Sequence, residues 1–201
     1  MLRPLTAGLC ALGLTACVSV LPEPKVPDGL YRFGPMEAEY DLQASVIVRE
    51  PDASRLVAGR AIAAVDETGA VRLVPGVEWT DSSAHLMQMA MLDLLKGPRG
   101  ATAVSPDSGG LADYELFWTV TDFSLSGSTG HCRIRASLLD GSSRAVLEQT
   151  VVSTSAEATG KGNPARAQAL SEAGRKCVRD VAAFVSEKAV PKDEETPELE
   201  L

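Results

Sequence analysis

The side chains of this sequence that could support chemistry are few, and they lie far apart. Only two histidines occur among the 201 residues, at His85 and His131, and a general base must lie within hydrogen-bond reach of the group that it activates. His131 directly precedes Cys132, but adjacent residues of a strand point to opposite faces of the sheet. The acidic residues form no close pair that spacing alone would assign to acid–base catalysis. We therefore expect no catalytic residues, no metal site and no cofactor.

Motifs that build catalytic or nucleotide-binding sites are also missing. The sequence contains no Gly-x-Ser-x-Gly, His-Glu-x-x-His, Cys-x-x-Cys or Walker motif. The stretch Gly160-Lys161-Gly162 before Asn163-Pro164 superficially resembles a phosphate loop. It lacks the downstream Gly-Lys-Ser/Thr, and the start of a helix alone explains its glycines and its proline, with Asn163 as N-cap. The motifs favour a protein that is not an enzyme.

A cysteine near the N-terminus carries the most specific signal. Arg3 precedes an apolar run from Leu5 to Leu14, and Thr15-Ala16 then lead directly into Cys17. This is the three-part layout of a secretory signal, and it resembles the bacterial lipoprotein box, in which the cysteine is lipidated and becomes the new N-terminus. The alternatives are a plain signal peptide or an apolar helix, although the run is too short to span a bilayer. We expect cleavage before Cys17 and acyl chains on its sulfur and amine.

The residue after the cysteine bears on the choice of membrane. In lipoproteins with this box an Asp there often favours retention in the inner membrane, so Val18 indicates the outer membrane. More than one acyl chain makes such an attachment stable. We therefore expect a lipid-anchored protein at the periplasmic face of the outer membrane.

Composition limits the partners. The formal net charge is −8, which argues against nucleic acid and against a polybasic mode of membrane binding. Aromatic residues make up only 4% of the chain, so Val, Leu, Ala and Met must build most of the core. Past the signal, the chain is long enough for one domain with a real core.

The chain divides into four parts by composition. Three prolines mark a tether after the cysteine, and a short acidic stretch at the C-terminus cannot bury enough surface to order itself. The parts are a signal peptide (1–16), a lipidated cysteine with its tether (17–29), a folded domain (30–189) and an acidic tail (190–201).

Within the domain, strands alternate with two long helices. The alternation of apolar and polar residues along this strand shifts by one residue between Val120 and Phe123. This shift predicts a β-bulge near Thr121-Asp122. This pattern predicts an α/β (α+β) fold: a single two-layer domain with a mostly antiparallel or mixed sheet and two main helices. Strands are expected at 30–33, 43–49, 61–65, 70–74, 114–125, 132–138 and 145–155, and helices from 80–82 to 96 and over 163–188.

The first helix is apolar nearly all round. Between Leu86 and Leu95 only Gln88 and Asp93 are polar, and such a helix is buried on more than one side. One hypothesis is that its second side meets another helix, a copy of the chain or a partner. The alternative is burial between the sheet and the C-terminal helix. The candidate partner interface consists of Met87, Met89 and Met91.

Two cysteines remain after removal of the signal and lipidation of Cys17. Strand alternation puts Cys132 on the core face, and helix periodicity puts Cys177 on the stripe that faces the sheet. A disulfide would close a loop of roughly 45 residues, which the chain-entropy model values at about 4 kcal/mol. The alternative is two buried free thiols that behave as small apolar residues. An oxidising compartment favours the disulfide.

Several stretches together point to a known family. They are Leu30-Tyr31-Arg32-Phe33, then Ser45-Val46-Ile47-Val48-Arg49 running into Glu50-Pro51, then Val77-Glu78-Trp79-Thr80-Asp81 before the first helix, and Tyr114 to Val120 with Phe123. From Leu30 to Lys188 the sequence resembles the ABC-type transport auxiliary lipoprotein family, which includes the paraquat-inducible protein C-like lipoproteins. Pro75-Gly76 departs from the pattern that usually precedes Trp79. A tryptophan at that place is either a core anchor, the commoner role, or a contact residue.

The resemblance implies a function without implying functional residues. Members look like α/β sandwiches at the outer membrane that act beside an ABC permease, its ATPase and a periplasmic MCE-domain protein in transport of lipids or hydrophobic compounds. The implied partners are that system and the membrane, through the anchor, with a homo-oligomer as a further option and no nucleic acid. The alternative function is a structural or assembly lipoprotein that serves lipopolysaccharide or outer-membrane proteins.

Overall fold

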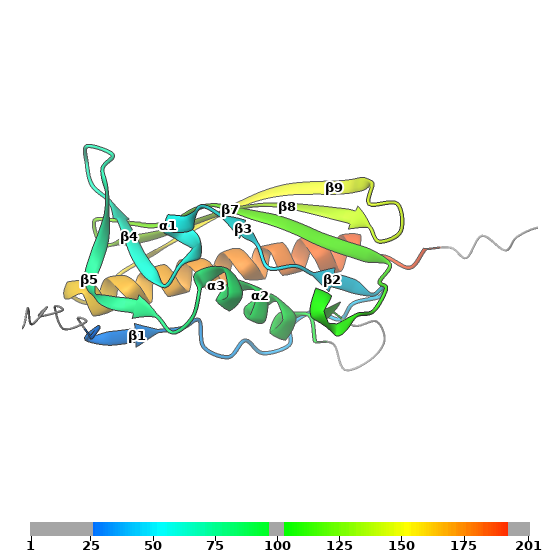
Figure 1. Cartoon of the computed structure of the whole chain (residues 1–201), viewed down its shortest axis with the longest axis horizontal. Helices are drawn as coiled ribbons and strands as arrows, with labels where there is room; N and C mark the ends of the chain where they lie inside the picture. Colours follow the sequence, from blue (N-terminus) through cyan, green and yellow to red (C-terminus); the bar gives the residue numbers. More distant parts are fainter. Residues whose placement is uncertain (1–25, 97–102, 193–201) are drawn as a thin grey trace, which may run out of the picture.

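The computed structural model describes residues 26–96 and 103–192. The expected signal, the lipidation site at Cys17 and the acidic stretch from Asp193 lie outside the described residues, so the expectations about them stay predictions. The described part is an α+β domain in which a curled mixed sheet is covered on one face by two main helices (Figure 1), as the sequence predicts.

The elements follow the predicted order with a few additions. The short helix α1, the two-residue strands β3 and β6 and the 3₁₀ turn η1 were not expected from the sequence. The strands are β1 (Gly29–Tyr31), β2 (Val46–Val48), β3 (Asp52–Ala53), β4 (Ala61–Val65), β5 (Val71–Trp79), β6 (Ala103–Val104), β7 (Tyr114–Ser126), β8 (Thr129–Asp140) and β9 (Val146–Glu157). The helices are α1 (Arg55–Ala58), α2 (Ser83–Leu94), η1 (Pro106–Ser108) and α3 (Gly162–Lys188).

The long strand β7 organises the sheet. It pairs antiparallel along its whole length with β8, and β8 pairs antiparallel with β9. The other edge of β7 is shared by three short parallel strands in succession, β2, β3 and β4. β4 then pairs antiparallel with β5, and β5 pairs parallel with β1. The sheet is therefore mixed, with three long antiparallel strands at one side.

The predicted β-bulge is present in β7. The register with β8 shifts between Val120 and Asp122, and the extra residue returns the apolar side chains to the core face. Val120 and Phe123 are accordingly buried on either side of the shift. Without the bulge, one-half of the strand would point its apolar side chains to solvent.

The two main helices start differently from each other. α2 begins as predicted, because the Ser82 hydroxyl accepts a hydrogen bond of 3.1 Å from the backbone N–H of His85. α3 begins earlier than predicted: its N-cap is Lys161, with no side-chain cap, and Asn163 instead donates to the backbone carbonyl of Pro75 at 3.0 Å. Asn163 therefore ties the start of α3 to β5 rather than capping the helix.

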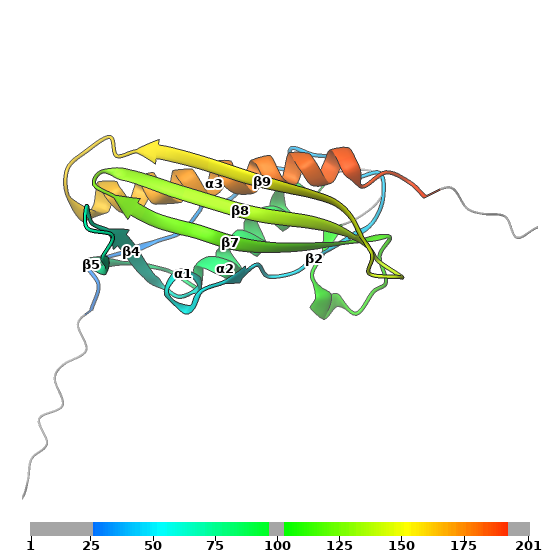
Figure 2. The ribbon, with the colours of Figure 1, turned by 90° about the horizontal axis from the view of Figure 1, so that it is seen from above.

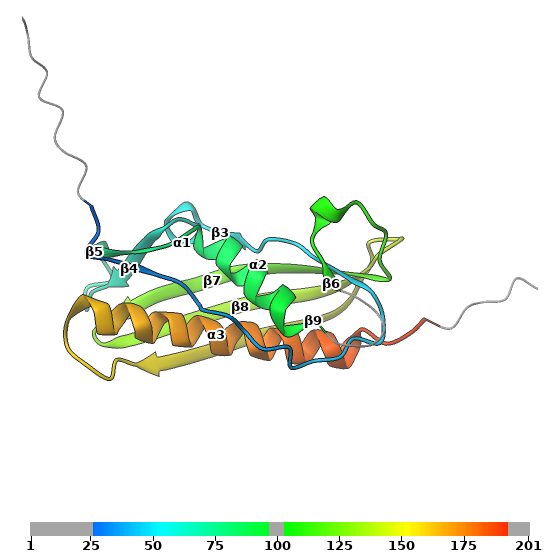
Figure 3. The ribbon, with the colours of Figure 1, turned by 90° about the horizontal axis from the view of Figure 1, so that it is seen from below.

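Both main helices lie on the same side of the sheet. Figure 3 shows α2 and α3 in front of the strands, and the core fills the space between the layers. Its aromatic centre joins Trp79 at the end of β5 to Phe33 and Phe123. Trp79 is 1% exposed, so it is a core anchor. β5 reaches it by running through Pro75-Gly76, where Gly76 has a φ of 77°.

No helix among the described residues has the length and apolarity of a membrane-spanning segment.

Candidate functional site

The histidines are separate from each other. His85 lies in the first turn of α2, with its Nε2 4.0 Å from an Asp81 carboxylate oxygen. His131 lies on β8, where Ser124 and Ser155 are its cross-strand neighbours. Within residues 26–96 and 103–192, no three His, Cys, Asp or Glu side chains gather as metal ligands.

The three methionines of the candidate interface have different surroundings. Met87 and Met91 are completely buried, whereas Met89 is 45% exposed. Met87 and Met91 are therefore part of the hydrophobic core, and α2 also lies against α3. Met89 instead lines a small groove of about 350 Å³ beside Pro35 and Leu86. Met89 alone of the three can reach a partner of the folded domain.

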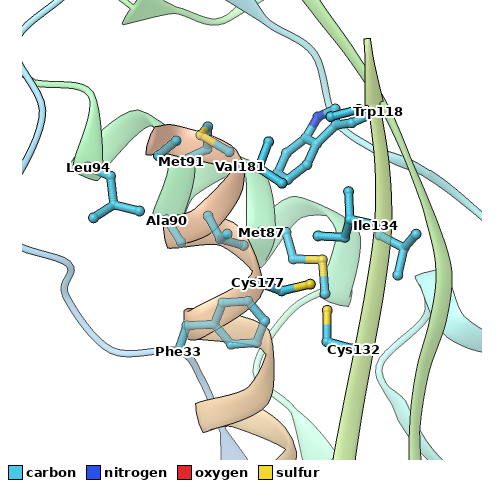
Figure 4. Close-up of a cluster of buried hydrophobic side chains, with 14 of the residues drawn as sticks. Phe33, Met87, Ala90, Met91, Leu94, Trp118, Cys132, Ile134, Cys177 and Val181 are labelled. Atoms are coloured by element: carbon cyan, nitrogen blue, oxygen red, sulfur yellow. The ribbon is translucent and has the colours of Figure 1, made fainter. Parts of the chain in front are cut away.

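The two cysteines meet in the core. Cys132 on β8 is 1% exposed and Cys177 on α3 is fully buried, and both carry free thiols in this structure. Figure 4 shows the two sulfurs pointing toward each other, with the Met87 thioether beside them. Burial raises the pKa of the Cys132 thiol, and a hydrogen bond from Cys132 lowers the pKa of Cys177. The sequence prediction that both cysteines lie at the boundary between helix and sheet agrees with this placement.

None of the described helices and strands lies over the face of β7, β8 and β9 that points away from α2 and α3. Figure 2 shows this face toward the viewer, with α2 and α3 behind it. Alternation along the strands and their register put one set of side chains on it. This open sheet face includes Phe117, Thr119 and Asp122 on β7, Arg133, Arg135 and Ser137 on β8, and Gln149, Val151 and Ser153 on β9.

Apolar and basic side chains are mixed on the open sheet face. Phe117 is 40% exposed and Val151 is 52% exposed, and Arg135 lies between Thr119 and Val151 in the register. Arg133 and Arg135 take part in none of the ion pairs of the described residues. The face therefore presents two cations, of which Arg133 lies opposite Asp122 in the register and Arg135 lies between Thr119 and Val151.

A buried ion-pair group closes one end of this face. Glu115 on β7 is 4% exposed and pairs with Arg49 and, at 2.9 Å, with Arg144. Arg144 adopts a φ of 61° in the turn between β8 and β9, a conformation that costs a non-glycine residue energy. The pairing holds this turn against the sheet, so the end of the open face has a fixed shape.

A second concave feature lies at the other end of the sheet. The projecting β4–β5 hairpin, the β7–β8 turn and the start of α3 enclose a groove of about 850 Å³. Its two arginines already have partners: Arg72 pairs with Asp66 at 3.2 Å, and Arg166 donates to the Gly127 carbonyl at 2.8 Å. The hairpin contributes charged residues and one large apolar side chain to the groove, Leu73, which is 57% exposed.

The sequence analysis did not identify the open sheet face. The signal was nevertheless in the sequence, because Phe117 and Val151 are apolar residues in the outward phase of their strands. An outward-facing aromatic residue on a strand with a regular core phase marks an exposed apolar site.

The geometry defines an α+β domain with one helix-covered face, one open face and no cluster of metal-ligand residues among its described parts. The chain belongs to the family of ABC-type transport auxiliary lipoprotein components, whose model matches residues 34–182. This confirms the resemblance found in the sequence. No curated protein matches the chain at a significant level.

Solved structures of low sequence identity share the fold. A Xanthomonas campestris protein is similar over 81% of this chain and 94% of its own, with a TM-score of 0.65 at 15% identity. An uncharacterised protein is similar over 74% of this chain and 99% of its own, with a TM-score of 0.58 at 12% identity. At these identities the likeness concerns the fold alone.

Proposed function

We propose that this protein is a lipid-anchored accessory subunit of an MCE-type ABC system, which moves lipids or hydrophobic compounds between the membranes of the envelope. The observation that carries the proposal is the family match over residues 34–182. The lipoprotein box at Cys17 supports an anchor, and Val18 after it supports the outer membrane. On this proposal the chain binds and positions its partner and catalyses no reaction.

The open sheet face is the surface that we propose for the partner. Aromatic and arginine side chains carry much of the binding energy at protein interfaces, and Phe117 lies there close to Arg135. Arg133 and Arg135 make no ion pair among the described residues, and only Arg133 has a carboxylate, Asp122, opposite it in the register. A partner with an acidic rim around an apolar centre would complement Arg135 and the apolar side chains of the face. We therefore propose that the MCE-domain protein binds this face through an acidic surface of this kind.

Co-purification of the full-length, lipidated chain from detergent-solubilised membranes tests the proposal. An MCE-domain protein should be recovered with the tagged chain. Recovery of a β-barrel protein or of the lipopolysaccharide assembly machinery in its place would contradict the role in transport. It would support the alternative function of a structural or assembly lipoprotein.

Two matched double variants locate the surface. Phe117→Asp/Val151→Asp should lower recovery of the partner by at least about tenfold, since each change places an acid against an acidic surface. Val71→Asp/Leu73→Asp is the control, because these residues are also half-exposed on a strand but lie on the β4–β5 hairpin. Equal recovery with both variants would exclude the open sheet face as the contact.

The anchor has a separate test. Cys17→Ser should release a folded, soluble domain from the membrane fraction and abolish support of transport in cells. Full transport by the soluble form would show that the anchor is incidental to the function.

A further inference from the structure

Cys132 and Cys177 come from different layers of the domain and are held in a fixed relation. Cys132, the fourth residue of β8, points into the core, and Cys177 points from α3 toward that strand (Figure 4). The height of α3 over the sheet is set one helical turn earlier, where the hydroxyl of Thr154 donates a hydrogen bond of 2.6 Å to the carbonyl of Ala173. Thr154 is also the cross-strand neighbour of Cys132. This hydrogen bond therefore links the strand neighbour of Cys132 to the helical turn that precedes Cys177.

We propose that Cys132 and Cys177 form a disulfide in the mature protein, which fastens α3 to the central strands. This inference is independent of the partner that the protein binds. It requires only the oxidising envelope compartment that the lipoprotein box predicts, where paired thiols persist as disulfides.

The reaction is two successive thiol–disulfide exchanges with an oxidised dithiol protein of the Cys-x-x-Cys class. The Cys177 thiolate attacks one sulfur of the donor disulfide, forms a mixed disulfide and releases the first donor thiolate. The Cys132 thiolate then attacks Cys177 sulfur, which forms the intramolecular bond and releases the second donor thiolate. Two protons leave the protein thiols and are taken up by the donor thiolates, and two electrons reduce the donor. Either thiolate can act first, because the step balances in the same way with the roles of Cys132 and Cys177 exchanged.

Burial determines when this exchange takes place. Cys132 and Cys177 are 1% and 0% exposed, and a donor protein cannot reach either sulfur in the folded domain. The bond must form while α3 is still undocked from the sheet. Once formed, it is sealed in the core and should resist reductant until the domain is unfolded.

Trapping the thiols in the native protein is the first test. The full-length chain is purified from envelope membranes in detergent, labelled in denaturant with N-ethylmaleimide, then reduced and labelled with iodoacetamide. The peptides that contain Cys132 and Cys177 should carry only the second label. N-ethylmaleimide on both peptides would overturn the proposal.

Thermal unfolding with and without the bond is the second test. The oxidised protein is compared with protein that has been reduced in denaturant and refolded with reductant. The loop of roughly 45 residues should make the Tm of the oxidised form higher by roughly 8–16 °C. Equal Tm values in the two states would contradict a stabilising disulfide.

Variants separate the bond from the packing of the two side chains. Cys132→Ala, Cys177→Ala and the double variant should each abolish the difference in Tm between oxidising and reducing conditions. The matched control is Val181→Ala, another fully buried residue of α3 one turn further along. It should lower the Tm in both states and leave the difference between them unchanged. If the single cysteine variants keep the wild-type difference, reductant acts elsewhere and the proposal fails.

Discussion

The indole of Trp79 stacks on the ring of Phe123, with centroids 5.4 Å apart and ring planes 18° apart. Trp79 ends β5 at one side of the sheet, and Phe123 follows the bulge in β7. Phe33 meets both rings edge-on, at 5.7 and 5.9 Å. Three segments that are distant in the sequence therefore join at one aromatic cluster, in a chain with few aromatic residues.

Removal of the indole should accordingly be costly. Trp79→Ala empties the centre of this cluster, and we expect a loss of roughly 3–5 kcal/mol in the free energy of unfolding, measured by urea titration. Phe117→Ala is the control, since this aromatic side chain lies half-exposed on the open sheet face and should cost less than about 1 kcal/mol. Comparable losses of unfolding free energy in the two variants would show that the aromatic cluster stabilises the fold no more than an exposed aromatic side chain does.

The sequence predicted the helices and strands because residues close together along the chain determine where these elements begin, end and bulge. The phase slip after Val120 predicted the bulge, and the expected start of the first helix at 80–82 includes Ser82, whose hydroxyl caps α2. Strand and helix periodicity also placed Cys132 and Cys177 at the boundary between the layers. Each of these follows from neighbours within a few residues along the chain.

Long-range pairing could not be predicted in this way. The edge of β7 is divided among β2, β3 and β4, and nothing in those short segments specifies their order along it. The contacts of the last described residues could not be predicted from the sequence either. Lys192, which the composition assigned to the tail, ion-pairs with Asp140, and the hydroxyl of Tyr114 donates to the Val190 carbonyl at 2.8 Å. Such contacts depend on where the folded chain brings the strand ends.

The methionines of α2 offer a matched pair of variants. Met91→Asp would place a carboxylate in the core with no partner, so we expect a loss of more than about 4 kcal/mol, or no folded protein. Met89→Asp changes a side chain that is 45% exposed, and we expect less than about 1 kcal/mol. Chemical denaturation gives both values.

The same pair tests the helix as an interface. Size-exclusion chromatography with light scattering should give the same mass for Met89→Asp and the native protein if α2 serves the core alone. A folded Met89→Asp protein of lower mass would instead identify the exposed side of α2 as a contact between copies of the chain.

Asp140 should make stability sensitive to acid. Lys192, and then the hydroxyl of Ser142 and the backbone N–H and hydroxyl of Ser143, hold the pKa of this carboxyl well below its usual range. Because the folded-state pKa is depressed, the stabilisation is fully present above the unfolded pKa of about 3.9 and is lost as pH falls below it. Asp140→Asn removes this dependence.

Urea titrations between about pH 2 and pH 7 check the sign. The native protein should lose stability below about pH 4 more steeply than Asp140→Asn, and the gap between them should close as pH falls. Asp52→Asn removes an exposed carboxylate outside the turn and should keep the native slope. A steep acid limb that persists in Asp140→Asn would assign the acid sensitivity to other carboxyl groups.

Gly130 sets how closely α3 approaches the sheet. It is buried on β8 under the start of the helix, and a Cβ there would lie 2.5 Å from the Cα of Leu170 and 2.6 Å from its backbone nitrogen. Backbone atoms of a helix cannot yield as a side chain does, so Gly130→Ala must push α3 away from β8. Overpacking of this kind costs roughly 1–3 kcal/mol.

The control for this variant is Gly110→Ala, because a Cβ at Gly110 meets nothing within 4 Å. It should leave the free energy of unfolding within about 0.5 kcal/mol of the native value. Displacement of α3 should also separate Cys177 from Cys132, so Gly130→Ala should slow recovery of the oxidised form during refolding with a disulfide donor, whereas Gly110→Ala should not. Native stability and native oxidation rate in Gly130→Ala would mean that α3 packs further from the sheet than these distances require.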